Sequence, residues 1–134
     1  MAINSQVEIL RVMLFPKDFI AVKRFYSEVI GWPITHQWDM GEADRGVMFD
    51  SGCGTFELLS WQHSHAQDGY LPVQGCGCSL GVANVWALWD ELKDQPAILF
   101  GLKSFPWGND AFGIADPEGF QLIFFSDTAR RSLT

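Results

Sequence analysis

The feature that most constrains this fold is a helix pattern that occurs twice along the chain. Asp18 and Asn84 are residue types that cap helix N-termini, and apolar residues follow each of them at three- and four-residue spacing. The shift that carries Asp18 onto Asn84 also superposes the apolar faces that follow the two caps. We therefore expect an internal duplication, with two copies of one module. The apolar positions that coincide are Phe19 with Val85, Val22 with Leu88, and Tyr26 with Leu92.

Short runs of β-branched and aromatic residues surround each helix pattern and predict strands. The first helix is expected to end at Gly31 and the second before Pro96. The order βαβββ in each half predicts an α+β protein. Each module is expected to form a curved sheet, mixed or antiparallel, with its helix on the convex side and its concave side left for a ligand. The predicted strands cover 7–15, 33–39, 45–51 and 55–62, then 76–83, 97–105, 109–116 and 120–126.

The length of 134 residues fits a single domain, 1–134. Within it, we expect module one to cover about 7–62 and module two about 76–126. The polar segment of about 63–75, which contains glycine and proline, is expected to connect the two modules. The tail 127–134 is polar, so we expect it to fray.

The charge balance limits the class of partner. A formal net charge of -7 opposes binding to nucleic acid or to an anionic membrane surface. No apolar run approaches the roughly 20 residues that a membrane helix needs, and the N-terminal residues show no secretory signal pattern. The three cysteines lack the spacing of a disulfide framework. We therefore expect a cytoplasmic protein with reduced thiols and without nucleic-acid or membrane partners.

Three motifs, taken in order, indicate a family. They are Phe25-Tyr26-Ser27-Glu28-Val29-Ile30-Gly31-Trp32 at the end of the first helix, then Pro106-Trp107-Gly108, then the turn Asp116-Pro117-Glu118-Gly119. Their order and spacing resemble the vicinal-oxygen-chelate superfamily, which includes glyoxalase I, extradiol dioxygenases, fosfomycin-resistance enzymes and bleomycin-binding proteins. The resemblance covers nearly the whole chain. Within this superfamily, the chain most resembles in character the metal-free, bleomycin-resistance-like binding proteins.

In the metal-dependent members, the resemblance implies four ligand positions, two in each module. They fall on Arg11, Glu57, Gly77 and Ile123 of this chain. Only Glu57 carries a metal ligand, because arginine is permanently cationic and glycine and isoleucine offer no side-chain donor. A catalytic zinc site needs about three protein ligands. The resemblance therefore implies that the inherited site has been lost, and we expect no metal, no cofactor and no catalytic residue.

The three histidines offer one alternative metal site. His63 and His65 are separated by one residue and follow the strand predicted to carry Glu57, and His36 lies on the strand after the first helix. The polar surroundings of His63 and His65 favour solvent-exposed side chains over metal ligands.

The residues expected to bind a ligand combine two opposite charges with aromatic rings. Arg11 and Glu57 are expected to point into the concave face, where a guanidinium can pair with a carboxylate and orient a polar ligand. Aromatic rings give a large apolar contact area and attract cations. The predicted binding residues are Arg11, Glu57, Trp61, Trp107, Phe112, Gln121, Ile123 and Phe125, and Trp38 and Phe49 are further aromatic candidates.

The favoured function is metal-free binding of an aromatic or cationic small molecule, similar to sequestration by the drug-resistance proteins of this family. Family precedent also implies a homodimer. One alternative is a divalent-metal-dependent lyase, isomerase or dioxygenase that uses Glu57. Another is a protein–protein module whose cavity is filled by its own side chains. The sequence leaves open whether metal-free catalysis occurs, and whether modules pair within one chain or are swapped between two.

Overall fold

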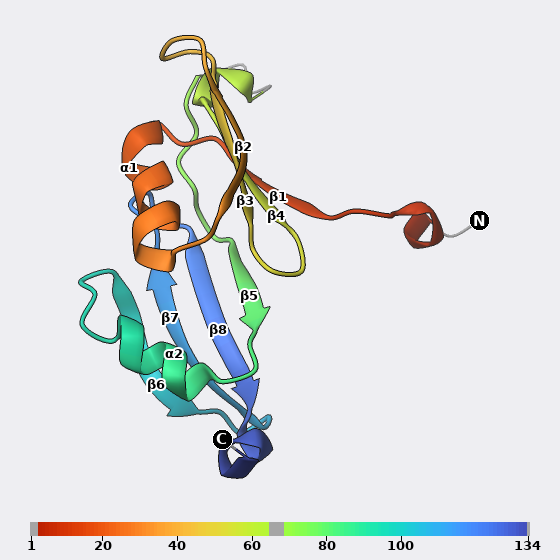
Figure 1. Cartoon of the computed structure of the whole chain (residues 1–134), viewed down its shortest axis with the longest axis vertical. Helices are drawn as coiled ribbons and strands as arrows, with labels where there is room; N and C mark the ends of the chain where they lie inside the picture. Colours follow the sequence, from red (N-terminus) through yellow and green to blue (C-terminus); the bar gives the residue numbers. More distant parts are fainter. Residues whose placement is uncertain (1–2, 65–68, 134) are drawn as a thin grey trace. The chain divides into compact units, whose positions relative to one another are not determined.

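The computed structural model describes residues 3–64 and 69–133 (Figure 1). The chain divides into two compact units, Met1–Pro72 and Val73–Thr134, which we call unit 1 and unit 2. The division falls inside the segment 63–75, which the sequence predicts to be a connection. The assignment of the whole chain to a single domain stays a prediction. In the described part of the chain, no helix is long and apolar enough to cross a membrane.

Unit 1 contains a four-stranded mixed sheet with a helix packed along one face (Figure 1). The strand order is β1-β4-β3-β2, in which β1 runs parallel to β4 and the other pairs are antiparallel. The strands are β1 (Arg11–Leu14), β2 (Ile34–Asp39), β3 (Arg45–Asp50) and β4 (Thr55–Leu59). The helical segments are α1 (Phe19–Arg24), the π-helix Phe25–Ile30 that continues it, and the 3-10 helices Ile3–Gln6 and Trp61–His63.

Unit 2 repeats this arrangement, with the strand order β5-β8-β7-β6 and a parallel β5–β8 pair. Arg11 pairs with Thr55 in unit 1, and the positions that the repeat shift makes equivalent, Gly77 and Gln121, pair in unit 2. The predicted duplication and the α+β fold class are thus confirmed. The elements are β5 (Gly77–Gly81), α2 (Val85–Leu92), β6 (Ile98–Ser104), β7 (Asn109–Ala115), β8 (Gln121–Asp127) and the 3-10 helix Thr128–Leu133.

Both helices begin where the sequence predicts, because both caps form. The side chain of Asp18 accepts a hydrogen bond from the Ala21 N–H at 3.1 Å. The side chain of Asn84 accepts one from the Ala87 N–H at 2.9 Å. These bonds satisfy backbone donors that have no partner within the first turn. Gly31, at φ 80°, ends the first helix in the left-handed conformation that glycine adopts without strain.

Two strand predictions were too long. The predicted strand 7–15 begins only at Arg11, because its partner β4 starts at Thr55 and leaves the preceding residues without a ladder. Leu10 is 79% exposed as a result. The predicted strand 55–62 ends at Leu59, after which the buried Ser60 hydroxyl accepts a hydrogen bond from the Arg45 N–H at 2.8 Å.

The prediction that the tail frays was wrong for Thr128–Leu133, which forms a 3-10 helix. Its first residue is held by two hydrogen bonds. The Thr128 N–H donates to the Gly108 carbonyl at 2.8 Å, and its hydroxyl donates to the Asp110 carboxylate at 2.7 Å.

Each sheet has one face covered by its helix and one that the helix leaves uncovered, which we call the open face. In unit 1, the Tyr26 ring packs against Phe49 and Phe56 at ring-centroid distances of 5.9 and 5.5 Å. In unit 2, Trp89 of α2 packs on Phe112 at 5.2 Å. Because neighbouring residues of a strand point to opposite faces, these contacts fix which side chains lie on each open face.

The open face of unit 1 carries His36, Trp38, Met48, Glu57, Leu59, Met13 and Arg11, as the strand registers require. The open face of unit 2 carries Ser79, Gln121, Ile123, Phe125, Gly113, Phe100 and Lys103.

Candidate functional site

Trp38 is the most firmly placed ring on the open face of unit 1. Its indole lies directly over the backbone of Gly46 on the neighbouring strand β3. A Cβ atom at Gly46 would overlap the six-membered ring of the indole, so only glycine leaves room for it. The His36 ring lies two residues earlier on the same face, 5.7 Å from Trp38 between ring centroids.

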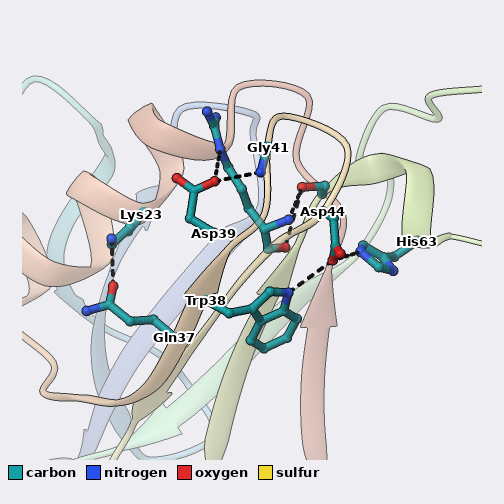
Figure 2. A network of polar contacts seen from close by, with 9 residues as sticks. Lys23, Gln37, Trp38, Asp39, Gly41, Asp44 and His63 are labelled. Carbon is teal, nitrogen blue, oxygen red and sulfur yellow. Dashed lines mark hydrogen bonds and ion pairs between the residues drawn. The ribbon is translucent and has the colours of Figure 1, made fainter.

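A carboxylate holds the edge of this indole (Figure 2). The Trp38 Nε1–H donates to Asp44 Oδ1 at 3.1 Å, and His63 Nε2 lies 2.9 Å from the same oxygen. The indole N–H, and after it the His63 ring, hold the pKa of the Asp44 carboxyl below its ordinary value. Asp44 is therefore ionised at neutral pH and keeps its acceptor for the indole. The ring is fixed both at its face and at its edge.

The hairpin between β2 and β3 is braced next to this carboxylate (Figure 2). Asp39 accepts a hydrogen bond from the Gly41 N–H at 3.0 Å and forms an ion pair with Arg45 Nε at 3.2 Å. The Gly41 bond first, and the Arg45 bond second, lower the pKa of the Asp39 carboxyl. These contacts keep the hairpin in the conformation that presents Asp44 to Trp38.

Arg11 and Glu57 lie on the open face as predicted from sequence, but the structure does not pair them. In the register of β1 and β4, Arg11 is opposite Thr55 while Met13 is opposite Glu57, so the two charged residues are offset by two positions. Within residues 3–64 and 69–133, neither makes an ion pair within 4.0 Å. Both charges therefore remain available to another molecule.

The predicted residues of β8 lie together on the open face of unit 2. Ile123 and Phe125 alternate with buried neighbours, and Gln121 is exposed at the start of the strand. The Phe125 ring lies over Gly81, whose Cβ position is 3.0 Å from the ring. Ile123 similarly lies 3.0 Å from the Cβ position of Gly113. Glycines opposite these side chains let them lie close to the sheet.

The prediction that Phe112 forms a wall of the binding face was wrong. Phe112 is 0% exposed, stacks on Phe124 at 5.5 Å and packs against Trp89 beneath α2. The register places Gly113, not Phe112, opposite Ile123, which puts Phe112 on the helix side. Phe49, the further candidate in the first half, is also 0% exposed and belongs to the core of unit 1.

The two remaining tryptophans of the predicted set lie outside the strands. Trp61 begins the 3-10 helix that follows β4 and is half-buried. Trp107 lies in the loop between β6 and β7, is 71% exposed, and stacks on Phe105 with ring centroids 4.8 Å apart. Met13, which shares its strand face with Arg11 in the sequence pattern, and Met48 also lie on the open face but are not in the predicted binding set. Sequence analysis missed Phe100, because irregularities in the β6 register break the alternation there.

The residues at the four positions implied by the family do not fit a metal ion. Arg11 is a cation and Ile123 is aliphatic, so neither can ligate. A Cβ atom at Gly77 would lie 2.9 Å from the Gln121 carbonyl oxygen, so a ligand side chain has no room there. Of the four, only Glu57 is a donor. In the described residues no three His, Cys, Asp or Glu side chains converge. His63 contacts Asp44 instead, and His65 lies outside the described residues.

A shallow hollow of about 180 Å³ lies along the outer surface of the first helix, away from the open face. It is lined by Ile20, Lys23, Arg24, Ser27 and Glu28. Arg24 and Glu28 form an exposed ion pair at 4.0 Å, and Lys23 donates a hydrogen bond to Gln37 at 2.8 Å. These are ordinary surface contacts of a helix, and we assign the hollow no function.

Solved structures share this fold. TioX from Micromonospora sp. ML1 superposes with a TM-score of 0.74 at 17% identity, over 90% of this chain and 99% of that one. TnmS3, an antibiotic binding protein from Streptomyces sp. CB03234, gives 0.67 at 20% identity, over 95% and 98% of the two chains. A lactoylglutathione lyase from Agrobacterium tumefaciens superposes with a TM-score of 0.66 at 21% identity, over 89% of this chain and 92% of that one. At these identities the likeness concerns the fold alone.

Sequence comparison identifies the family. No curated protein matches the chain significantly. A family model described as the Glyoxalase/Bleomycin resistance protein/Dioxygenase superfamily matches residues 8–124, which is most of the chain. The two βαβββ repeats and the parallel pairing of the first and last strand in each agree with this match. The chain therefore belongs to the glyoxalase/bleomycin resistance protein/dioxygenase superfamily.

Proposed function

We propose that this protein binds an aromatic small molecule without a metal ion and sequesters it. The observation that carries the proposal is the Trp38 indole, which is fixed over Gly46 and bonded to Asp44 on a face that its helix leaves open. A ring that is already immobilised loses little entropy when a ligand stacks on it. Aromatic stacking contributes about 0.5–1.5 kcal/mol beyond the burial of area.

The charges on the same face support a ligand with polar groups. Glu57 carries a carboxylate that no cation in the described residues neutralises, which suits a cationic group on the ligand. Arg11 offers planar donors for an oxygen acceptor. The likeness to TnmS3, an antibiotic binding protein, is consistent with a drug-binding role. We further propose a homodimer, on the precedent of the family, and a cytoplasmic location, because the three cysteines lack the spacing of a disulfide framework.

A second candidate is a divalent-metal-dependent lyase, isomerase or dioxygenase of the same superfamily. The carboxylate of Glu57, at an inherited ligand position and without an ion pair in the described residues, favours it. Metal analysis of the purified protein distinguishes the two candidates. A tightly held stoichiometric ion that is lost in Glu57→Gln would support the enzyme and overturn metal-free binding.

The test of the proposed function is tryptophan fluorescence with a panel of cationic, neutral and acidic aromatic drugs. We expect at least one drug to quench the emission saturably, and Trp38→Phe to weaken its binding about tenfold. Trp89→Phe is the matched control, because Trp89 packs on Phe112 under α2 and should leave affinity unchanged. No response to any drug, or equal effects of the two substitutions, would contradict the proposal.

A further inference from the structure

A second group of rings surrounds a lysine in unit 2. We call Phe100, Lys103, Phe105 and Trp107 the Lys103 cluster. The Lys103 Nζ lies 5.1 Å from the centroid of the Phe100 ring and 5.1 Å from that of Phe105. Phe105 in turn stacks on Trp107 at 4.8 Å with an interplanar angle of 20°. The Phe100 and Phe105 rings are nearly perpendicular, at 84°, so Lys103 contacts two rings of different orientation, and the second of these stacks on the exposed indole.

The ammonium of Lys103 contacts rings where a carboxylate would be the usual partner. The chain carries 16 acidic and 9 basic residues, so carboxylates outnumber cations. Yet in the part of the chain that the structure describes, no carboxylate oxygen lies within 4.0 Å of Lys103 Nζ. Ring faces attract the charge but accept hydrogen bonds only weakly. The three N–H donors of the ammonium therefore remain available to an anion.

Trp107 is exposed although its loop is braced. The Gly108 N–H donates to the Phe105 carbonyl at 3.0 Å, and the Phe105 N–H donates to the Asn109 carbonyl at 2.7 Å. A third bond joins the Thr128 N–H to the Gly108 carbonyl at 2.8 Å. Gly108, at φ 99°, permits this turn. One indole face is stacked on Phe105, and the large exposed area leaves a preorganised surface for another ring.

We propose that the Lys103 cluster is a ligand site of unit 2 by itself, and that its ligand class is a planar aromatic ring bearing a carboxylate. Lys103 binds the carboxylate and Trp107 stacks on the ring. This assignment rests on the proposed function and specifies the ligand for unit 2. A cationic ligand is disfavoured at this position, because Lys103 repels it and already occupies the ring faces that would attract it.

The test uses three probes that share one ring system and differ in charge: 1-naphthaleneacetate, 1-naphthaleneacetamide and 1-naphthylmethylammonium. Their affinities are measured by NMR titration of the ¹⁵N-labelled protein, with the Trp107 indole signal assigned from Trp107→Phe. We expect the acetate to shift the Trp107 indole and the amides of 101–109, and to bind roughly fivefold to tenfold more tightly than the amide probe. We expect the ammonium probe to leave these signals unchanged.

Lys103→Met should remove the preference for the acetate, so that acetate and amide probes bind equally. Lys103→Arg should retain it. Lys93→Met is the matched control, because it deletes the same charge at the end of α2, where Lys93 pairs with Asp90 at 3.6 Å. Added salt should weaken the binding of the acetate probe but not that of the amide probe.

The outcomes separate this inference from the proposed function. If the probes shift Trp38 but not Trp107, small-molecule binding stands and the Lys103 assignment falls. Equal affinity for the acetate and amide probes, or an unchanged preference in Lys103→Met, also overturns it. If no probe shifts any tryptophan signal, and the drug panel gives no response either, both proposals fail.

Discussion

The two units each use an aspartate to hold a tryptophan, but for different purposes. In unit 1, Asp44 accepts the Trp38 N–H at 3.1 Å on the open face, and its side chain is 49% exposed. In unit 2, Asp110 accepts the Trp86 N–H at 2.8 Å, and the residue is only 2% exposed. The first bond orients a ring toward solvent, whereas the second ties a helix to a sheet.

The surroundings of the two carboxylates explain the difference. Asp110 also accepts hydrogen bonds from Ser104 at 2.6 Å and from Thr128 at 2.7 Å, so it joins α2, β6 and the C-terminal 3-10 helix to β7. Among the described residues, the Asp44 carboxylate bonds His63 besides Trp38, and both partners are accessible. The same chemical bond is therefore structural in unit 2 and positions a candidate binding residue in unit 1.

The largest expected effect is the loss of the buried carboxylate. Asp110→Asn should lower the free energy of unfolding by about 2–4 kcal/mol, because an amide cannot accept from all three donors. Urea unfolding measures this. Asp44→Asn is the comparison, and its effect on stability should be much smaller because its bonds compete with water. Equal losses of stability in the two variants would contradict the view that only the carboxylate of unit 2 is structural.

A backbone substitution tests how Trp38 is held. Gly46→Ala should displace the Trp38 indole, because the added Cβ overlaps the ring. We expect the free energy of unfolding to fall by about 1–3 kcal/mol. The affinity for aromatic ligands should fall about tenfold. Gly101→Ala is a matched control. Gly101 also lies against a tryptophan, but its Cβ position is 3.6 Å from Trp89, an ordinary contact. The Trp38 indole NMR signal should move in the first variant only.

Acid should weaken the contributions of the two aspartates to stability in the same direction, because the pKa of each carboxyl is lowered in the folded state. Hydrogen bonds from Ser104 first, and then from Thr128 and Trp86, lower the pKa of the Asp110 carboxyl from its ordinary 3.8. A lowered folded-state pKa adds stability that is present above the ordinary value and is lost as the pH falls through the folded-state pKa. Stability followed from neutral pH into strong acid should therefore fall less steeply in Asp110→Asn and in Asp44→Asn than in the wild type.

The smallest expected effect belongs to His63. His63→Ala removes one exposed bond to Asp44, so ligand affinity should change by less than about twofold. Isothermal titration with the best drug of the panel measures this. A tenfold loss would show that His63 touches the ligand directly.

Much of the fold was predictable because it depends on local patterns. Asp18 and Asn84 cap helices wherever an apolar helical face follows them, and both bonds form. Asp116 bonds the backbone of its turn, accepting from the Glu118 N–H at 2.8 Å, as its turn sequence indicates. Alternation also placed Glu57 and Ile123 on the open faces.

The sequence predictions failed where the strand register determines which face of the sheet a side chain occupies. Glu57 and Ile123 are equivalent under the shift that relates Asp18 to Asn84, but their partners Met48 and Gly113 are not, because Gly113 comes one position too early. A slip of one residue turns every side chain of a strand to the other face. Phe112 therefore faces the core. The bond between Trp38 and Asp44 depends on hairpin geometry that no local pattern specifies.

The close approach at Gly77 has an evolutionary consequence. Because the carbonyl oxygen of Gln121 is 2.9 Å from the missing Cβ, and is backbone that cannot rotate away, no single codon change at this position restores a ligand side chain without moving one strand. A ligand side chain at position 77 therefore requires a distorted β5–β8 pair. Under the proposed metal-free function, this contact makes the gain of a metal ligand at position 77 costly, whereas substitutions among the rings and charges of the open faces do not meet this obstacle.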